Sequence, residues 1–508
     1  MSGKSIIIGS VLLLAGLAVL LRWNAQRPSE EKPKQALVLY CAANLTKPIT
    51  EAAKQFETEQ DIAIQLSFGG SGTLLNNLQV DPSGDLYLAA DASYIALGRE
   101  KGLLDETIPL ARQTPVIAVA KGNPKQIRAI DDLLRKDVKV VLANTEASVG
   151  KLGKKILSGL GKWKELEQHV TATGVFKPTV MDVANDLKIG ALDAGIVWDS
   201  TVAQFPELEA VHVEIFDRHV EEASVAILKR SKFPNAALRF ARYLQAPEKG
   251  GAILKKQGFV TVDGDAWSVQ PELTLFSGAM LRPAIEETIK EFEAREGVTV
   301  NRVYEGCGSL VSQMKAGGKP DAFFACDRSF YEMVNDRFAK GEVISSNQVV
   351  ILVPKGNPKE LKTLKDLLRP DLKIALGHPE KSALGVLTVG LFKQEGLHEK
   401  LQAASDRIVH ASKGDDLVNM MKVGSRDAAL VYVSNAALVR DQCDLIPVDI
   451  PQAIAVQPYG VANDSRYKHL MNRLLDRIHG VESRKRFEAL GFAWKAEDGV
   501  AKEGGGGK

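Results

Sequence analysis

Short apolar runs alternate with helix-like segments along most of the chain. The run ALVLYCAA, which starts at Ala36, predicts a strand, and PITEAAKQFETE, from Pro48, spaces its apolar residues along one helical face. IAIQLSF, from Ile62, predicts a second strand, and GTLLNNL, from Gly72, opens a second helix. The later runs PVIAVA, KVVLA and DAGIVW are again β-rich and are followed by polar or helical sequence. This alternation predicts α/β architecture with largely parallel sheets.

The pattern occurs twice. GNPKQIRAIDDLLRKDVKVVLA, from Gly122, returns as GNPKELKTLKDLLRPDLKIALG from Gly356, and DLYLAADASY, from Asp85, returns as DAFFACDRSF from Asp321. A near-constant offset indicates tandem duplication of one unit of roughly 225 residues. The expected segments are an amino-terminal anchor or signal with its tether (1–35), a first binding unit (36–262), a linker (263–272), a second, divergent unit (273–497) and a flexible tail (498–508).

The amino terminus contains an uncharged apolar segment at residues 5–21, between Lys4 and Arg22. Its length is the lower limit for a membrane span and also fits the core of a signal peptide. The bulky Trp23 disfavours cleavage, and the first cysteine, Cys41, lies too far away for lipid attachment. We therefore expect an exported protein that an uncleaved amino-terminal helix tethers to the inner membrane, with a cleaved signal as the alternative.

Composition and charge exclude several classes of function. The chain has 508 residues, so we expect more than one domain. A formal net charge of +2 does not favour nucleic acid as a partner. The eight histidines form no metal-binding motif, so we expect no metal cation and no cofactor. The four cysteines are expected to be buried or unpaired thiols, although an oxidising compartment would permit one disulfide.

The stretch FGGSGTLLNNL, from Phe68, lies at a predicted strand-to-helix turn. Free N–H groups at a helix start favour anions, glycines allow close approach to the backbone, and the Ser71 hydroxyl is a further donor. A Gly-Ser turn of this kind also caps helices that bind nothing. Three more predicted helix starts follow strands in the same unit, near Asn44, at residues 148–153 and near Val180. Together they predict a cleft lined by neutral donors.

In order and spacing, several short motifs make each repeat resemble the periplasmic molybdate/tungstate-binding proteins of ABC transporters. The motifs are AANLT, FGGSGTL, GDLYLAAD, KGNP, GIVW and the closing QGF. The resemblance implies the type 2 periplasmic-binding fold, in which two lobes with mixed, mainly parallel sheets surround a cleft. It also implies a tetrahedral oxyanion held by serine hydroxyls, backbone N–H groups and a tyrosine.

Carried over by position, the resemblance implies five ligand-binding residues in the first unit. Ser71 keeps the family's serine, whereas Asn44 replaces the other serine with an amide that can still donate. Trp198 replaces the tyrosine with an indole N–H. The backbone donors of the second lobe fall on Gly150 and Val180. This hypothesis therefore retains oxyanion binding but does not specify which anion binds.

The second unit departs further from the family. Met280 stands at the Asn44 position, and Cys307 stands at the Ser71 position beside Glu305. The backbone positions fall at Leu384 or Gly385 and at Gly414, while Tyr432 retains the tyrosine. A thioether cannot donate a hydrogen bond and a thiol donates only weakly. We therefore expect either a weakened or lost oxyanion site or a different ligand, with Cys307 as a small apolar filler.

The resulting hypothesis is an extracytoplasmic solute-binding protein that delivers an oxyanion, molybdate or tungstate, to an ABC transporter permease. The alternatives are a solute sensor or scaffold with the same fold, or another anion such as sulfate or phosphate. An enzyme on this fold, such as a porphobilinogen-deaminase-like transferase, requires an arginine cluster and a cofactor-bearing cysteine, neither of which is evident. We therefore expect no catalytic residues.

Overall fold

The computed structural model describes residues 36–495. The apolar segment 5–21 and the tail 498–508 lie outside them, so the predicted anchor lies outside the described residues. Within residues 36–495, no helix combines the length and apolar character that crossing a membrane requires. Contacts divide the chain into two compact units, 1–107 with 113–233, and 108–112 with 234–508.

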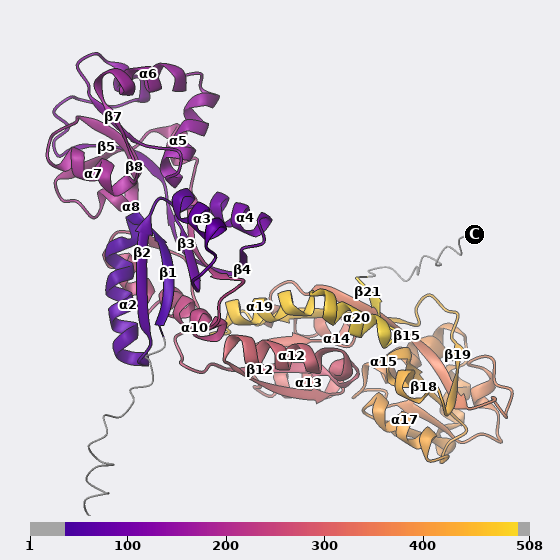
Figure 1. The fold of residues 1–508 in the computed structure, drawn as a ribbon. Coiled ribbons are helices and arrows are strands. Elements are labelled where there is room, and N and C mark those ends of the chain that lie inside the picture. Colours follow the sequence, from indigo (N-terminus) through magenta and orange to yellow (C-terminus); the bar gives the residue numbers. More distant parts are fainter. Residues whose placement is uncertain (1–35, 496–508) are drawn as a thin grey trace, which may run out of the picture. The chain divides into compact units, whose positions relative to one another are not determined.

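The first lobe of the first repeat is built on parallel strands. β1 pairs with β2 and with β3 in parallel, and β10 joins β3 antiparallel, in a sheet of order β11-β4-β10-β3-β1-β2. Figure 1 shows α2 beside β1 and β2. The strands are β1 (Ala36–Ala42), β2 (Ala63–Gly69), β3 (Leu86–Ala89), β4 (Leu104–Gln113), β10 (Glu221–Leu228) and β11 (Val260–Thr261). The helices are α2 (Thr46–Gln60), α3 (Ser71–Val80), α4 (Ala92–Glu100), α10 (Pro234–Gln245) and α11 (Gly250–Lys256).

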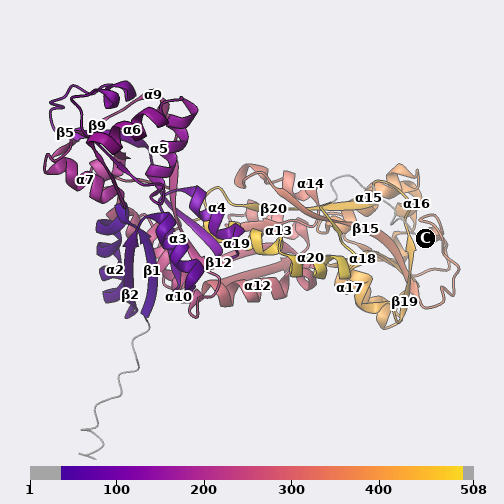
Figure 2. The same cartoon turned by 45° about the horizontal axis from the view of Figure 1, so that its top comes forward.

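The second lobe of the first repeat has a five-stranded sheet of order β7-β6-β8-β5-β9. Its strands and helices enclose a core of aliphatic and aromatic residues that includes Trp198. Figure 2 shows α5, α6 and α7 around this sheet. The strands are β5 (Pro115–Ala120), β6 (Val140–Ala143), β7 (Val175–Lys177), β8 (Ala194–Trp198) and β9 (Leu208–Val211). The helices are α5 (Ser148–Gly159), α6 (Trp163–Thr173), α7 (Val180–Lys188), α8 (Asp199–Val202) and α9 (Glu214–Asp217).

In the second repeat one long strand, β15 (Glu342–Pro354), joins the sheets of both lobes. Its first half pairs with β20 and its second half with β18 and β19. The other strands are β12 (Glu272–Gly278), β13 (Thr299–Glu305), β14 (Ala322–Phe324), β16 (Ile374–Gly377), β17 (Ile408–Ala411), β18 (Ala428–Tyr432), β19 (Cys443–Pro447), β20 (Ile454–Val461) and β21 (Ala493–Trp494). The helices are α12 (Arg282–Glu296), α13 (Cys307–Lys315), α14 (Arg328–Glu332), α15 (Ala383–Gln394), α16 (His398–Ala403), α17 (Gly414–Lys422), α18 (Val433–Ala436), α19 (Lys468–Ile478) and α20 (Val481–Ala489).

The two repeats share their topology and even their strand register. Ala36 pairs with Ala63 in the first repeat, and the residues at the same positions of the second, Glu272 and Thr299, pair in the same way. The predicted tandem α/β fold with mixed sheets is therefore confirmed. The sheets are not mainly parallel, however, because β5 and β15 pair antiparallel with each of their neighbours.

A buried ionic network explains why α10, which belongs to the first repeat, groups with the second compact unit. Arg242 of α10 donates to Glu296 of α12 at 2.9 Å, and Arg473 of α19 donates to the same carboxylate at 2.7 Å. Glu296 is only 2% exposed. The contact-defined boundary therefore precedes α10, whereas the repeat was expected to extend to residue 262.

Candidate functional site

Four strand-to-helix turns of the first unit meet around one small hollow. Its empty space, including the part open to solvent, is about 230 Å³. Every lining side chain is uncharged. The lining residues are Ala42, Ala43, Asn44, Gly69, Gly70, Ser71, Ala90, Ala147, Ser148, Val149, Thr179, Val180 and Trp198. Four of the five residues inferred from the sequence therefore lie around the same hollow, and the fifth, Gly150, does not.

Gly150 lies beside an adjacent cavity, where Trp163 and Ile196 also contribute to the lining. A Cβ at position 150 would lie 2.0 Å from the carbonyl oxygen of Asn144, so no side chain fits there. The glycine lets the first turn of α5 pack against the preceding loop. The lining residues of this turn are Ser148 and Val149, which lie one or two positions earlier than the resemblance implied.

Two neighbouring groups donate hydrogen bonds to the Ser71 hydroxyl oxygen. Its oxygen accepts the backbone N–H of Ala90 at 3.2 Å and the hydroxyl of Ser148 at 2.9 Å. Both serines are almost completely buried. Because a hydroxyl oxygen has two acceptor lone pairs and one hydrogen, Ser71 keeps its own hydrogen to donate to a ligand. Sequence reasoning placed Ser148 at a helix start but did not identify its hydroxyl as the partner of Ser71.

The Asn44 amide is already partly engaged, although its nitrogen carries two hydrogens and can donate twice. Its Nδ2 donates to Oε1 of Gln113 at 2.8 Å, and Ser200 donates to the same oxygen at 2.8 Å. Gln113 is itself fixed because its Nε2 donates to the carbonyl of Ala90 at 2.7 Å. Among residues 36–495, no hydrogen-bond partner satisfies the buried Oδ1 of Asn44. No local motif marked Gln113, since the residue reaches the site only through the fold.

Three helices direct their amino termini at the hollow. α3 begins at Ser71, α5 at Ser148 and α7 at Val180, and each starting residue lines the hollow. The residues that precede α3 and α5 are Gly70 and Ala147, which make no side-chain cap. Free N–H groups and the positive ends of the helix dipoles therefore favour an anion at this point.

The glycines of the opening turn allow the two lobes of the first unit to close on each other. The N–H of Gly72 donates to the carbonyl of Glu146 at 2.8 Å, and the Tyr94 hydroxyl donates to the carbonyl of Thr145 at 2.8 Å. A Cβ on Gly70 or on Gly72 would lie 2.9 Å from the Glu146 oxygen. Side chains at these positions would separate the lobes. The glycines of this turn are therefore needed for the close approach of the Glu146 carbonyl.

The second repeat contains a corresponding hollow with about 270 Å³ of empty space, again including its open part. Of the residues inferred there, Met280, Gly414 and Tyr432 line it, whereas Cys307 and Gly385 do not. Leu384, the alternative to Gly385, does line it. The lining residues are Ala279, Met280, Glu305, Gly306, Cys326, Ser382, Ala383, Leu384, Ser412, Lys413, Gly414, Tyr432 and Asn435.

Cys307 is not a free apolar filler, because it forms a disulfide with Cys326. Cys41 and Cys443 are free and buried, as expected for unpaired cysteines. The first repeat brings the same two positions together in its fold. The positions that correspond to Cys307 and Cys326 in the first unit are Ser71 and Ala90, which are hydrogen-bonded to each other.

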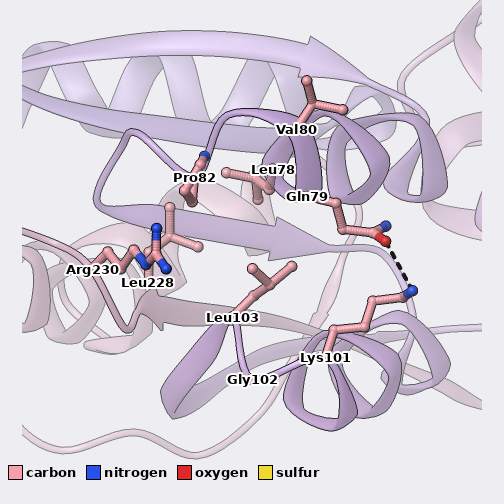
Figure 3. Close-up of a pocket in the computed structure, with 9 residues that line it drawn as sticks. All are labelled: Leu78, Gln79, Val80, Pro82, Lys101, Gly102, Leu103, Leu228 and Arg230. Atoms are coloured by element: carbon pink, nitrogen blue, oxygen red, sulfur yellow. Dashed lines mark hydrogen bonds between the residues drawn. The ribbon is translucent and has the colours of Figure 1, made fainter.

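A larger hollow, with about 710 Å³ of empty space including its open part, lies elsewhere in the first unit (Figure 3). Apolar residues such as Leu78 and Leu103 line it together with Lys101, which donates to Gln79 at 2.9 Å. The hollow lies beside the segments that lead into β3 and β4, at the amino edge of the sheet. Because ligands of such sheets bind beyond the carboxyl ends of the strands, we do not assign the site here.

Comparison with known proteins agrees with the tandem architecture. The family model of bacterial extracellular solute-binding proteins matches twice, at residues 37–260 and 273–493. The molybdate-binding protein ModA of Mycobacterium tuberculosis is 29% identical over 271 residues, which cover 51% of this chain and 97% of that protein. A sulfate-binding protein of Synechococcus elongatus is 23% identical over 305 residues, covering 54% and 85%.

Among solved structures, the periplasmic molybdate-binding protein of Azotobacter vinelandii aligns with a TM-score of 0.37 and 18% identity, covering 44% of this chain and 98% of that protein. The two family matches together span most of the sequence. The chain therefore belongs to the bacterial extracellular solute-binding proteins, with two copies of the family's domain in tandem.

Proposed function

We propose that the first unit captures a tetrahedral oxyanion, molybdate or tungstate, for delivery to an ABC transporter permease. The observation that carries this proposal is the hollow in which uncharged side chains and three helix amino termini converge. Aligned neutral dipoles stabilise a dianion without the desolvation cost of a buried counter-charge.

The relatives support an oxyanion but differ in which one. The protein from M. tuberculosis is named for molybdate and that from S. elongatus for sulfate. The hollow favours a fully deprotonated ion, because the helix N–H groups and the Ser71 hydroxyl are donors that require acceptor oxygens. Hydrogen phosphate would direct its own hydrogen at one of these donors unless the unpartnered Asn44 Oδ1 received it.

Delivery follows from lobe closure. The contacts of Gly72 and Tyr94 with the loop at residues 145–146 hold the lobes of the first unit together over the hollow. A permease would recognise this closed form and release the anion when the lobes separate. We further propose that residues 5–21 tether the protein to the membrane, which membrane fractionation of the full chain and of a chain lacking residues 1–35 would test.

Calorimetric titration of the full chain with molybdate, tungstate, sulfate and phosphate tests the assignment. We expect one strong site per chain, for molybdate or tungstate. Ser71→Ala combined with Asn44→Ala should weaken it by at least about 100-fold, because two hydrogen bonds to a charged ligand are affected. Two equal sites would contradict the assignment to the first unit. No heat with any of the four anions would contradict transport and favour a scaffold.

A further inference from the structure

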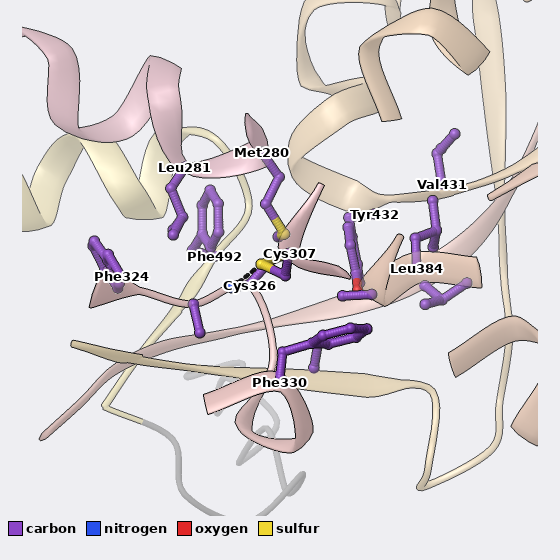
Figure 4. Packing of buried hydrophobic residues seen from close by; sticks show 14 of the residues in the cluster. Met280, Leu281, Cys307, Phe324, Cys326, Phe330, Leu384, Val431, Tyr432 and Phe492 are labelled. Atoms are coloured by element: carbon purple, nitrogen blue, oxygen red, sulfur yellow. Dashed lines mark hydrogen bonds between the residues drawn. A yellow bond between two sulfur atoms is a disulfide. The ribbon is translucent and has the colours of Figure 1, made fainter. Parts of the chain in front are cut away.

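Three positions of the second cleft carry sulfur where the first cleft carries none. Met280, Cys307 and Cys326 correspond, each with the offset of 236, to Asn44, Ser71 and Ala90 of the oxyanion hollow. Met280 and Cys326 line the second hollow, and the disulfide joins Cys326 to Cys307 directly behind it. Figure 4 shows these three residues together, with Tyr432 on the side toward Leu384. We call Met280 and the Cys307–Cys326 disulfide the sulfur floor.

The sulfur floor cannot hold an oxygen atom of an oxyanion. A thioether and a disulfide have no hydrogen to donate, and the Cys307 sulfur is itself an acceptor, 3.0 Å from the N–H of Cys326. In the first unit the corresponding groups are an amide and a hydroxyl that donate. An anion oxygen placed on the sulfur floor would therefore lose its hydrogen bonds to water without replacement.

The opposite wall of the second cleft retains its donors. α15 begins at Ala383 and α17 at Gly414, both residues line the hollow, and neither helix has a side-chain cap. The Tyr432 hydroxyl is buried, and among residues 36–495 it has no hydrogen-bond partner. This orphaned hydroxyl, on a residue that is 3% exposed, indicates that a ligand completes the site.

Charged groups at the cleft balance each other. Glu305 and Lys413 both line the hollow and form an ion pair at 3.0 Å. The Nδ2 atom of Asn435 donates to Asp415 at 3.1 Å, and its oxygen has no hydrogen-bond partner among residues 36–495. A Cβ added to Gly414 would lie 2.3 Å from this oxygen. That oxygen thus packs against the first turn of α17. The helix starts and Tyr432 are left as the groups that determine which ligand binds.

We propose that the second cleft binds a tetrahedral anion in which a terminal sulfur replaces one oxygen. The sulfur atom would lie on the sulfur floor, and the oxygens would accept hydrogen bonds from Tyr432 and the starts of α15 and α17. A terminal sulfur is a weak acceptor and highly polarizable, so contact with other sulfur atoms satisfies it where an oxygen would lack a donor.

Thiosulfate and sulfate, which differ in one terminal atom, provide the test. The full chain carrying Ser71→Ala and Asn44→Ala, in which the first site is silenced, would be titrated with each anion by calorimetry. We expect thiosulfate to occupy one site and to bind at least about tenfold more tightly than sulfate. Tyr432→Phe in the same background should weaken thiosulfate about tenfold. Met333→Asn, an exposed methionine outside the cleft, is the matched control and should change neither affinity.

Exchanging the sulfur floor for the residues of the first unit makes the test reciprocal. Met280→Asn with Cys307→Ser and Cys326→Ala should abolish the preference for thiosulfate, and a thermal melt would show that the chain is folded. Equal affinities for the two anions, no thiosulfate binding by a folded chain, or an unchanged preference after the exchange would each overturn the proposal. If the chain that retains Ser71 and Asn44 does not bind molybdate, this result contradicts only the function proposed for the first unit.

Discussion

The two hydrogen bonds that the Ser71 oxygen accepts leave its hydroxyl hydrogen available as a donor. Two donors, from Ala90 and Ser148, occupy its oxygen, so its hydrogen is oriented before any ligand arrives. Donors that are oriented in advance lose little entropy on binding and bond strongly to a charged ligand. The same arrangement makes Ser148 a positioning residue that acts through Ser71.

Ser71→Ala and Ser148→Ala should therefore differ in their effect on anion affinity. Loss of the Ser71 hydrogen bond to a charged ligand should weaken molybdate binding by about 10- to 100-fold, whereas loss of Ser148 should cost less than about fivefold. Calorimetric titration of both variants measures this order. Ser158→Ala, on the exposed side of α5, is the control. The reverse order would contradict the assigned direction of the hydrogen bonds.

Gly70 permits closure of the first unit rather than folding of the turn. Its φ of −64° is accessible to any residue, so only the approach of Glu146 excludes a side chain. Gly70→Ala should weaken molybdate binding about tenfold while leaving the unfolding midpoint near that of the parent, since opening the lobes relieves the clash.

Gly69→Ala is the matched control, because its Cβ would meet the flexible end of Leu74 at 3.2 Å instead of a backbone oxygen. Titration and thermal unfolding of the two variants separate an effect on binding from an effect on stability. Equal losses of affinity in both variants would argue against the closure mechanism.

At the scale of helices and strands, most of the site is made of helix beginnings. α3 follows β2 in the sheet of the first lobe, whereas α5 and α7 follow the parallel strands β6 and β7 in the sheet of the second lobe. Each helix begins at the carboxyl end of its strand, and the three starts meet around the hollow. The uncapped starts of α3 and α5 leave backbone donors for a ligand, whereas Thr179 caps α7 by accepting the N–H of Asp182 at 3.2 Å. The expectation of helix starts at these turns is confirmed.

The helices α10, α12 and α19 are held together by Glu296 between Arg242 and Arg473. Burial lowers the pKa of Arg242 to about 10, and Glu296 acts in the opposite direction by favouring the charged guanidinium. Glu296→Gln should destabilise the chain by about 3–5 kcal/mol, because the two guanidinium groups would lose the buried carboxylate that both of them contact. Chemical denaturation measures this change. Glu287→Gln on the exposed face of α12 should have little effect, and a similar loss there would refute the role of the network.

At the scale of the whole molecule, duplication has produced two clefts with the same framework and different chemistry. The strand registers and the helix starts coincide between repeats. The side chains at the same positions do not, because amide and hydroxyl groups in one repeat are replaced by a thioether and a disulfide in the other. Duplication of this kind lets one copy keep a ligand while the other changes its specificity.

The uncharged lining of the first cleft predicts binding that is insensitive to pH. Carboxyl and lysine groups ordinarily titrate outside the range from about pH 6 to about pH 9, and no histidine is among the lining residues of this hollow. We expect molybdate affinity to stay within about twofold across that range, as titration in a series of buffers would measure. A steep change with pH would show that a charged group takes part in binding and would contradict the neutral site.

The sequence by itself determined the duplicated α/β fold and the positions of the helix starts, and it led to the hypothesis that Ser71 binds a ligand. These follow from local patterns, such as apolar periodicity and glycine at turns, and from comparison of one repeat with the other. Only the tertiary structure decided that Gln113 holds Asn44, that Ser148 orients Ser71, that Gly150 lies behind the site and that Cys307 is bridged to Cys326. Each of these features depends on contacts between residues that are far apart in the chain, and such contacts leave no local pattern in the sequence.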